Sequence, residues 1–244
     1  CATGLLQILL LDPAAPPDTA ACLIRHVAAA ARGRWLVLRA DVTSAHRGAW
    51  PCFDSEPWHL EHVSVRKKLP ERPAWPSVPD GLILRPAGGK DREFVGALFD
   101  EATRAAMPTL FESLRTPAQI VAGTERAYRA ILDDRPLVLI AERAGERLGH
   151  AIASVEVMNE TNGRREGILH DVFVLDEHRD RGLSRLLTAA VEALSTEAGE
   201  RYLIATVTAD SPTDRRRLLG LLSGKGWVEF SRRFVRRLSE SAGR

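Results

Sequence analysis

One stretch of the chain has the residue types and spacing to bind a phosphate group. Residues 168–184 (ILHDVFVLDEHRDRGLS) read as an apolar strand, a turn with one glycine and the start of a helix. The first amides of that helix, at about Arg181 to Ser184, lack partners inside the helix, and the helix dipole adds partial positive charge there. Gly182 lets a ligand approach the backbone. These features predict a cradle for a pyrophosphate group.

Basic residues are concentrated around this turn and near the end of the chain. Arg179, Arg181 and Arg185 flank Gly182, and residues 214–244 hold an excess of basic over acidic side chains. We therefore consider a local anion site, with a solvated charged face as the alternative.

Strands and helices alternate around the turn in a pattern typical of a mixed α/β sandwich. The helix after the turn has the cleanest amphipathic spacing in the chain, Asp91 is placed to cap an earlier helix, and Pro117 is placed to open the next. Turns are expected at Ala144-Gly145-Glu146 and at Asn162-Gly163. The expected order β-α-α-β-β-β-α-β-α-β occupies 82–85, 91–105, 116–132, 137–141, 148–158, 167–175, 183–198, 202–207, 212–222 and 227–237.

The first part of the chain resembles a partial copy of the second half of the longer segment. Residues 34–38 (RWLVL) match 201–205 (RYLIA), and Trp58 matches Trp227 at nearly the same offset. A helix is expected at 18–31, between the same flanking elements as in the second copy. We predict a degenerate half-domain at 1–69, a proline-rich linker at 70–80 and a complete domain at 81–240.

Composition excludes several classes of protein. The chain has 244 residues, 45% of them hydrophobic, with 34 basic and 32 acidic residues, so a nucleic-acid partner is not favoured. No apolar run reaches the ~18 residues that a membrane span needs. Cys1, Cys22 and Cys52 lack metal-ligand spacing, so we expect reduced thiols, a cytoplasmic location and no metal. Only four basic residues are lysines, which indicates a bacterial, GC-rich genome.

The glycine turn fits a known pattern, Arg-x-x-Gly-x-Gly/Ala after a strand ending in valine. Here it reads Arg179-Asp-Arg-Gly182-Leu-Ser184 after Phe173-Val174, and Gly226-Trp227 stands where the pattern has Gly-Phe. Together with the element order, this resembles the GNAT superfamily of acyl-CoA-dependent N-acyltransferases over about two thirds of the chain. The resemblance implies the mixed-sheet GNAT fold and makes 1–69 half of a second GNAT unit.

The resemblance also implies a co-substrate, acetyl-CoA, and a place for it. Pantetheine enters a gap between the two central strands and pairs with backbone groups near Phe173 and Val174, whose amides can polarise the thioester carbonyl. The residues assigned to acyl-CoA are Phe173, Val174, Leu175, Arg179, Asp180, Arg181, Gly182, Leu183, Ser184 and Arg185.

Family members transfer the acyl group directly to an amine, so a base must take the amine proton. His170 and Asp171 are the candidates, with ordinary polar strand residues as the alternative. Because neighbouring strand residues point to opposite faces, we expect only one of the pair to face the site. Imidazole takes up a proton near neutral pH, which favours His170.

The chain departs from the family pattern at two positions. Ser184 replaces glycine or alanine, and Leu222 stands where many members place a tyrosine that protonates the leaving thiolate. We expect Ser223 or solvent to supply that proton. In the N-terminal repeat, residues 12–17 (DPAAPP) oppose the motif without any glycine, and prolines lack the required amides. We therefore expect a structural role for that half.

The sequence leaves the substrates partly open. We expect an amine of a small molecule or a peptide as acceptor, without identifying it. One alternative is a large anionic donor, an aminoacyl-tRNA or a carrier protein, held by the basic tail. Another is a non-catalytic acyl-CoA-binding protein. The length of the acyl group, a homodimer, and a portion of chain before Cys1 also stay open.

Overall fold

The chain divides into two compact units in its computed structural model. The larger unit is residues 66–227, and the smaller unit joins residues 1–65 with 228–244. The structure describes residues 3–6, 19, 22, 25–27, 29–30, 37–44, 47, 50–51, 53, 58–105, 117–133, 136–159, 164–208 and 211–237.

The larger unit is built on five strands in the order β8-β7-β6-β5-β4. Neighbouring strands are antiparallel except β7 and β8, which are parallel. A parallel pair needs a crossover connection, and helix α5 is part of it. The strands are β4 (Leu82–Pro86), β5 (Leu137–Arg143), β6 (Glu146–Asn159), β7 (Arg164–Val174) and β8 (Tyr202–Val207).

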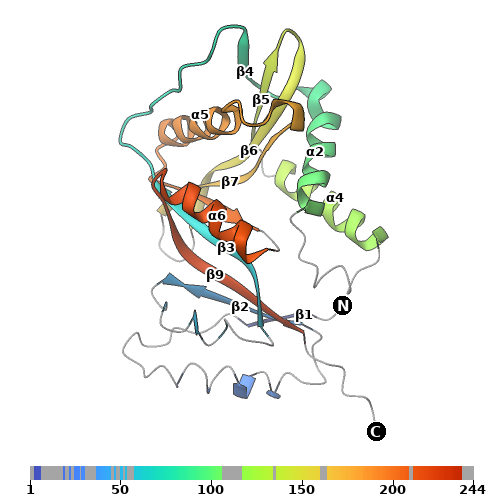
Figure 1. Cartoon of the computed structure of the whole chain (residues 1–244), viewed down its shortest axis with the longest axis vertical. Helices are drawn as coiled ribbons and strands as arrows, with labels where there is room; N and C mark the ends of the chain where they lie inside the picture. The colour runs from blue at the N-terminus through green and yellow to red at the C-terminus, as the bar shows by residue number, and fades with distance from the viewer. Residues whose placement is uncertain are drawn as a thin grey trace. The chain divides into compact units, whose positions relative to one another are not determined.

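Helices cover both faces of this sheet. Figure 1 shows α5 on one side of β5–β7 and the α2–α4 pair on the other. Together with β9 near the end of the chain, the order is β-α-α-β-β-β-α-β-α-β, so the predicted order and mixed α/β class are confirmed. The remaining bounds are η2 (Gly89–Asp91), α2 (Arg92–Ala105), α4 (Pro117–Asp133), η3 (Asp176–His178), α5 (Leu183–Glu197), α6 (Pro212–Ser223) and β9 (Trp227–Arg237).

Apolar side chains hold the α2–α4 face to the sheet. Val95 and Phe99 of α2 pack against Ile140 of β5 and Ile152 of β6. Burial raises the pKa of Tyr128, which lies partly buried at the edge of this cluster on α4. This packing holds in place the strand β6, on which the site depends.

The β5–β6 hairpin forms where the sequence predicts it. Ala144 (φ 50°) and Gly145 (φ 83°) both adopt the left-handed conformation, which suits a two-residue hairpin turn. β6 begins two residues earlier than predicted, because Glu146 pairs with Arg143 across the turn. The turn predicted at Asn162-Gly163 lies outside the described residues.

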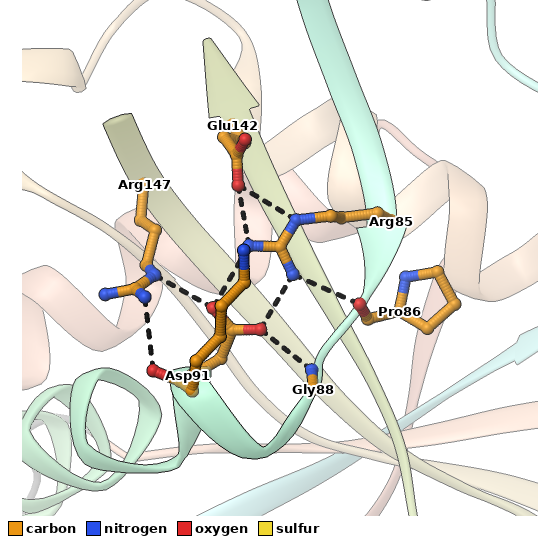
Figure 2. Close-up of polar contacts among 7 residues, drawn as sticks. Arg85, Pro86, Gly88, Asp91, Glu142 and Arg147 are labelled. Atoms are coloured by element: carbon orange, nitrogen blue, oxygen red, sulfur yellow. Dashed lines mark hydrogen bonds and ion pairs between the residues drawn. The ribbon is translucent and has the colours of Figure 1, made fainter. Parts of the chain in front are cut away.

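A buried carboxylate ties this hairpin to β4 and to the start of α2 (Figure 2). Asp91 is fully buried and binds Arg85 at 2.7 Å and Arg147 at 2.8 Å. Arg85 also binds Glu142 at 2.6 Å. The Arg85 guanidinium, through its hydrogen bond, holds the pKa of Asp91 well below its usual range. Asp91 was predicted to cap α2, but it is the last residue of η2, and its carboxylate accepts a bond from the Gly88 amide at the start of that turn.

The smaller unit repeats part of this plan. Its strands lie in the order β1-β2-β9-β3, with β1 (Thr3–Leu6) and β2 (Val37–Thr43) parallel. β3 (Trp58–Lys68) and β9 each begin with tryptophan and have 11 residues, as a repeat predicts. The described residues within 18–31 are helical. The compact units divide after residues 65 and 227, because β9 groups with the N-terminal strands. The domain boundaries expected at 69 and 81 stay a prediction.

Aromatic side chains form the core of the smaller unit. Phe53 stacks on Phe234 at 4.8 Å and meets Trp58 edge-on at 5.1 Å. Arg233 of β9 binds Asp41 of β2 at 2.6 Å, and this hydrogen bond raises the pKa of Arg233.

Candidate functional site

The parallel strands β7 and β8 separate partway along their length. Their pairing runs from Glu166 opposite Tyr202 to Leu169 opposite Ala205. β7 continues to Val174 and β8 to Val207 beyond the last pair. A gap between central strands was predicted from the family resemblance, and the described pairing opens one after Leu169.

A β-bulge lies on β7 at the point where this gap begins. Asp171 pairs with Ile152 of β6 and Leu169 pairs with Ala153, which leaves His170 as the extra residue. The Asp171 carboxylate lies 2.8 Å from His150 Nε2, and His170 Nε2 lies 2.7 Å from Ser154 Oγ.

This bulge changes the expected side-chain directions. His150 and Ser154 are four residues apart on β6 and share a face, so His170 and Asp171 both reach that face. The expectation that the two side chains point to opposite faces of the sheet was wrong. It assumed the regular alternation that a bulge interrupts.

Backbone groups of β7 face the gap in an alternating pattern. The Leu175 amide donates to Leu148 O on the β6 side at 3.0 Å. Because amides alternate along a strand, those of Val172 and Val174 point to the opposite edge, where β8 has separated. Arg179 Nε donates to Val174 O at 3.1 Å, which places this arginine at the same edge.

The start of α5 has the geometry that the sequence predicts for an anion cradle. Gly182 precedes the helix in the left-handed conformation (φ 80°), and no side chain caps the first turn. The amides of Leu183, Ser184 and Arg185 therefore lack intrahelical partners. A non-glycine residue at position 182 would strain this turn, even though a Cβ there would meet open space.

A cavity of about 490 Å³ connects the β7 strand end with this helix start. Most of the residues predicted to bind acyl-CoA line it. The lining residues are Val172, Phe173, Val174, His178, Arg179, Asp180, Gly182, Leu183, Ser184, Arg185 and Lys225.

The other predicted residues lie elsewhere. The Leu175 amide donates to the Leu148 carbonyl oxygen instead. Arg181 lines a second cavity of about 380 Å³ beside the proline-rich segment. His170 and Asp171 are not among the lining residues, and Ser223 is exposed at the end of α6, also outside the lining.

Positive charge in the cavity comes from three exposed side chains. Arg179 lies 5.4 Å over the Phe173 ring and binds Asp176 at 2.6 Å. Arg185 and Lys225 have no ion-pair partner within the described part of the chain. Lys225 was not among the predicted site residues. Its position between Gly224 and Gly226, just before the predicted last strand, was the available signal.

His150 was also missed by sequence reasoning. It is fully buried, its ring stacks on Phe173 at 6.5 Å, and its Nδ1 has no hydrogen-bond partner in the described structure. Its type alone gave no signal, since Asp171 stands 21 residues away along the chain.

The described residues offer neither a metal cluster nor a membrane-spanning helix. Among them, no three or more His, Cys, Asp or Glu side chains gather as a metal site would require. No helix in the described ranges is both long and apolar enough to span a bilayer.

Comparison with solved structures gives matches over nearly the whole chain. A tandem GNAT protein from the clavulanic acid biosynthesis pathway has 13% identity and a TM-score of 0.53, with 98% of this chain and 76% of that chain covered. A GCN5-related N-acetyltransferase from Kribbella flavida has 16% identity and a TM-score of 0.51, with 97% and 81% covered. These likenesses show the fold. No protein of curated function matches the chain.

Comparison with family models identifies the domain. Residues 100–219 match the model of the acetyltransferase (GNAT) family. This match includes the bulge, the β7–β8 gap and the start of α5. The chain therefore belongs to the GNAT superfamily and carries an acyltransferase domain of that type.

Proposed function

We propose that this protein transfers an acetyl group from acetyl-CoA to an amine of a small molecule or a peptide. The observation that carries the proposal is the β7–β8 gap, which has polar side chains at its closed end and free helix amides at its mouth. A thioester donor with an anionic tail fits this order of groups.

The helix start is the proposed site for the diphosphate of CoA. Amides of Leu183 and Ser184 would donate to phosphate oxygens, and the α5 dipole favours negative charge there. Arg185 and Lys225 line the same cavity and supply mobile positive charge. Pantetheine would then run along β7, where the Val172 and Val174 amides face the gap.

The proposed reaction is direct attack of the amine nitrogen on the thioester carbonyl. A C–N bond forms, the C–S bond breaks, and the CoA thiolate leaves. The Val172 and Val174 amides would donate to the developing oxyanion, a role that lowers barriers strongly in a preorganised site. His170 or Asp171 would take the proton that the amine loses.

The thiolate must regain a proton once the C–S bond breaks. Ser223 and solvent were the two expected sources. Because Ser223 is exposed and does not line the cavity, we favour solvent.

Calorimetric titration of acetyl-CoA tests this proposal through two variants matched in size. Gly182→Asp and Gly182→Asn impose the same left-handed backbone strain, but only aspartate brings a negative charge to the cradle. We expect Gly182→Asp to bind at least tenfold more weakly than Gly182→Asn. Equal affinities would place the diphosphate elsewhere, and a wild-type protein that binds acetyl-CoA without acetylating any amine would overturn the catalytic part.

A further inference from the structure

We infer that His150 is a positioning residue for Asp171, and that Asp171 is the base that takes the amine proton. This inference rests on the proposed function and adds to it a residue outside the acyl-CoA cavity. It begins from one contact, His150 Nε2 to Asp171 Oδ2 at 2.8 Å.

The burial of the two partners differs in a way that separates their roles. The His150 side chain is fully buried, whereas that of Asp171 keeps 15% of its surface exposed. A group with no exposed surface cannot meet an incoming amine. His150 therefore acts through Asp171, whose second oxygen, Oδ1, is left to receive a proton.

The unpartnered ring nitrogen of His150 defines what it gives to Asp171. An imidazolium would bury a second N–H donor at Nδ1, where no acceptor lies in the described structure. Burying such a donor is costly, so this geometry favours a ring that donates from Nε2 to Asp171 and carries no hydrogen on Nδ1. Asp171 thus receives an oriented hydrogen bond without a neutralising charge, and it keeps its negative charge for the amine.

The surroundings hold this pair in place. The His150 ring lies nearly parallel to the Phe173 ring, with 16° between the planes, and Phe173 pairs directly with His150 across the β6–β7 ladder. Asp171 follows the extra residue of the bulge, where β7 leaves β8. The pair therefore lies at the closed end of the gap, where the thioester of a bound donor would stop.

His170 is less suited to the role of base. Its Nε2 is engaged with Ser154 Oγ at 2.7 Å. Whichever of the two groups donates, this contact occupies His170 Nε2, whereas Asp171 keeps a second oxygen. This reverses the preference for His170 that its residue type suggested.

The kinetic test compares two substitutions of similar volume. Gln at position 150 can place an amide N–H near the position of Nε2, whereas Met is apolar. With the best amine from a panel, we expect His150→Met to lower kcat about 100-fold and His150→Gln to lower it less than tenfold. The dissociation constant of acetyl-CoA should stay within twofold in both. Equal losses in the two variants, or no loss in His150→Met, would overturn the inference.

A double substitution and a spectroscopic measurement complete the test. If His150 acts only through Asp171, then Asp171→Asn combined with His150→Met should have the kcat of Asp171→Asn alone. Multiplied losses would contradict this. Nitrogen-15 NMR, with His150→Gln to assign the signal, should show a neutral ring protonated on Nε2.

An imidazolium or a ring protonated on Nδ1 would overturn the role given to His150, whether or not an amine is acetylated. A wild-type protein that shows the expected tautomer but transfers nothing would instead refute the proposed function, leaving the His150–Asp171 contact intact.

Discussion

Each of the two units contains a parallel strand pair, and the two pairs can be compared over their described residues. In the smaller unit all four residues of β1 pair with β2, from Thr3 opposite Val37 to Leu6 opposite Ala40. In the larger unit β7 pairs with β8 through Leu169 only, and then both strands continue unpaired with each other. Within the described residues, β7 thus runs on past its last β8 partner, whereas the described part of β1 ends with its last β2 partner.

The segments after β1 and β7 differ in chemistry as well. After β7, Gly182 takes a left-handed conformation and opens a helix with free amides. The corresponding residues 12–17 (DPAAPP) have no glycine and end in two prolines, which carry no amide hydrogen. The proposed phosphate site therefore depends on a few backbone donors, and the sequence of the first part of the chain lacks them at the corresponding positions.

The two units also differ in how an aspartate ties strands together. Asp91 in the larger unit is fully buried between Arg85 and Arg147. Asp41 in the smaller unit binds Arg233 with 37% of its side chain exposed. Water can replace the lost partner at the exposed pair far more easily than at the buried one.

The largest effect is expected on stability, when Asp91 or Asp41 is replaced by alanine. Asp91→Ala should lower the free energy of unfolding by about 3 kcal/mol, because it leaves two part-buried guanidinium groups without their carboxylate. Asp41→Ala should lower it by less than about 1 kcal/mol. Urea denaturation followed by circular dichroism measures both. Similar losses in the two variants would mean that burial does not separate the two pairs.

Lowering the pH should remove the stability that ionised Asp91 provides. The pKa of Asp91 is lowered by its hydrogen bond from Arg85, so the folded state holds the ionised form more strongly than the unfolded chain does. The resulting stability is complete above the ordinary aspartate pKa of about 3.9 and is lost as pH falls below it. Asp91→Ala should lack this acid-dependent component, and the two proteins should converge in stability at low pH.

The next effect removes one amide from the cradle, as the prolines do in the smaller unit. Ser184→Pro keeps the first turn of α5 compatible with helix but deletes a donor. We expect acetyl-CoA affinity to fall 10- to 100-fold, since hydrogen bonds to charged groups contribute about 1.5–3 kcal/mol. Ser184→Ala keeps the amide and should bind within twofold of wild type. Calorimetry that found both variants alike would exclude this amide as a phosphate donor.

Much of the larger unit could be predicted because its signals are local. The leucine spacing of α5, the tight turn at Ala144-Gly145 and Pro117 at the start of α4 each depend on neighbouring residues. The predicted strands at 202–207 and 227–237 have the same bounds in the structure. Gly182 was also identifiable, because a single glycine between a strand and a helix restricts the turn strongly.

What could not be predicted depends on pairing between distant residues. The bulge at His170 arises from register with β6, and no residue in the strand marks it. His150 becomes part of the site only through that register, from an otherwise ordinary position on β6. Lys225 reaches the cavity because the turn after α6 lies beside the start of α5, which periodicity cannot reveal.

A smaller effect concerns the charges in the cavity. Lys225 is exposed, so its attraction for phosphate is partly screened by water and salt. We expect Lys225→Gln to weaken acetyl-CoA binding two- to fivefold at low salt, with the difference shrinking as salt rises. Lys225→Arg, which keeps the charge, is the control. A loss that salt leaves unchanged would mean that Lys225 acts through packing.

The smallest effect is expected in the smaller unit. It tests whether restored backbone amides are enough to create a second acetyl-CoA site. Replacing Pro16 with leucine and Pro17 with serine restores the two amides at the positions that correspond to Leu183 and Ser184. We still expect one acetyl-CoA per chain and an affinity within twofold of wild type. The reason is that all four described residues of β1 pair with β2, so the described part of that unit shows no gap between these strands along β1. A second molecule bound to this variant would show that the prolines alone separate the two copies, and that the strand gap is not required.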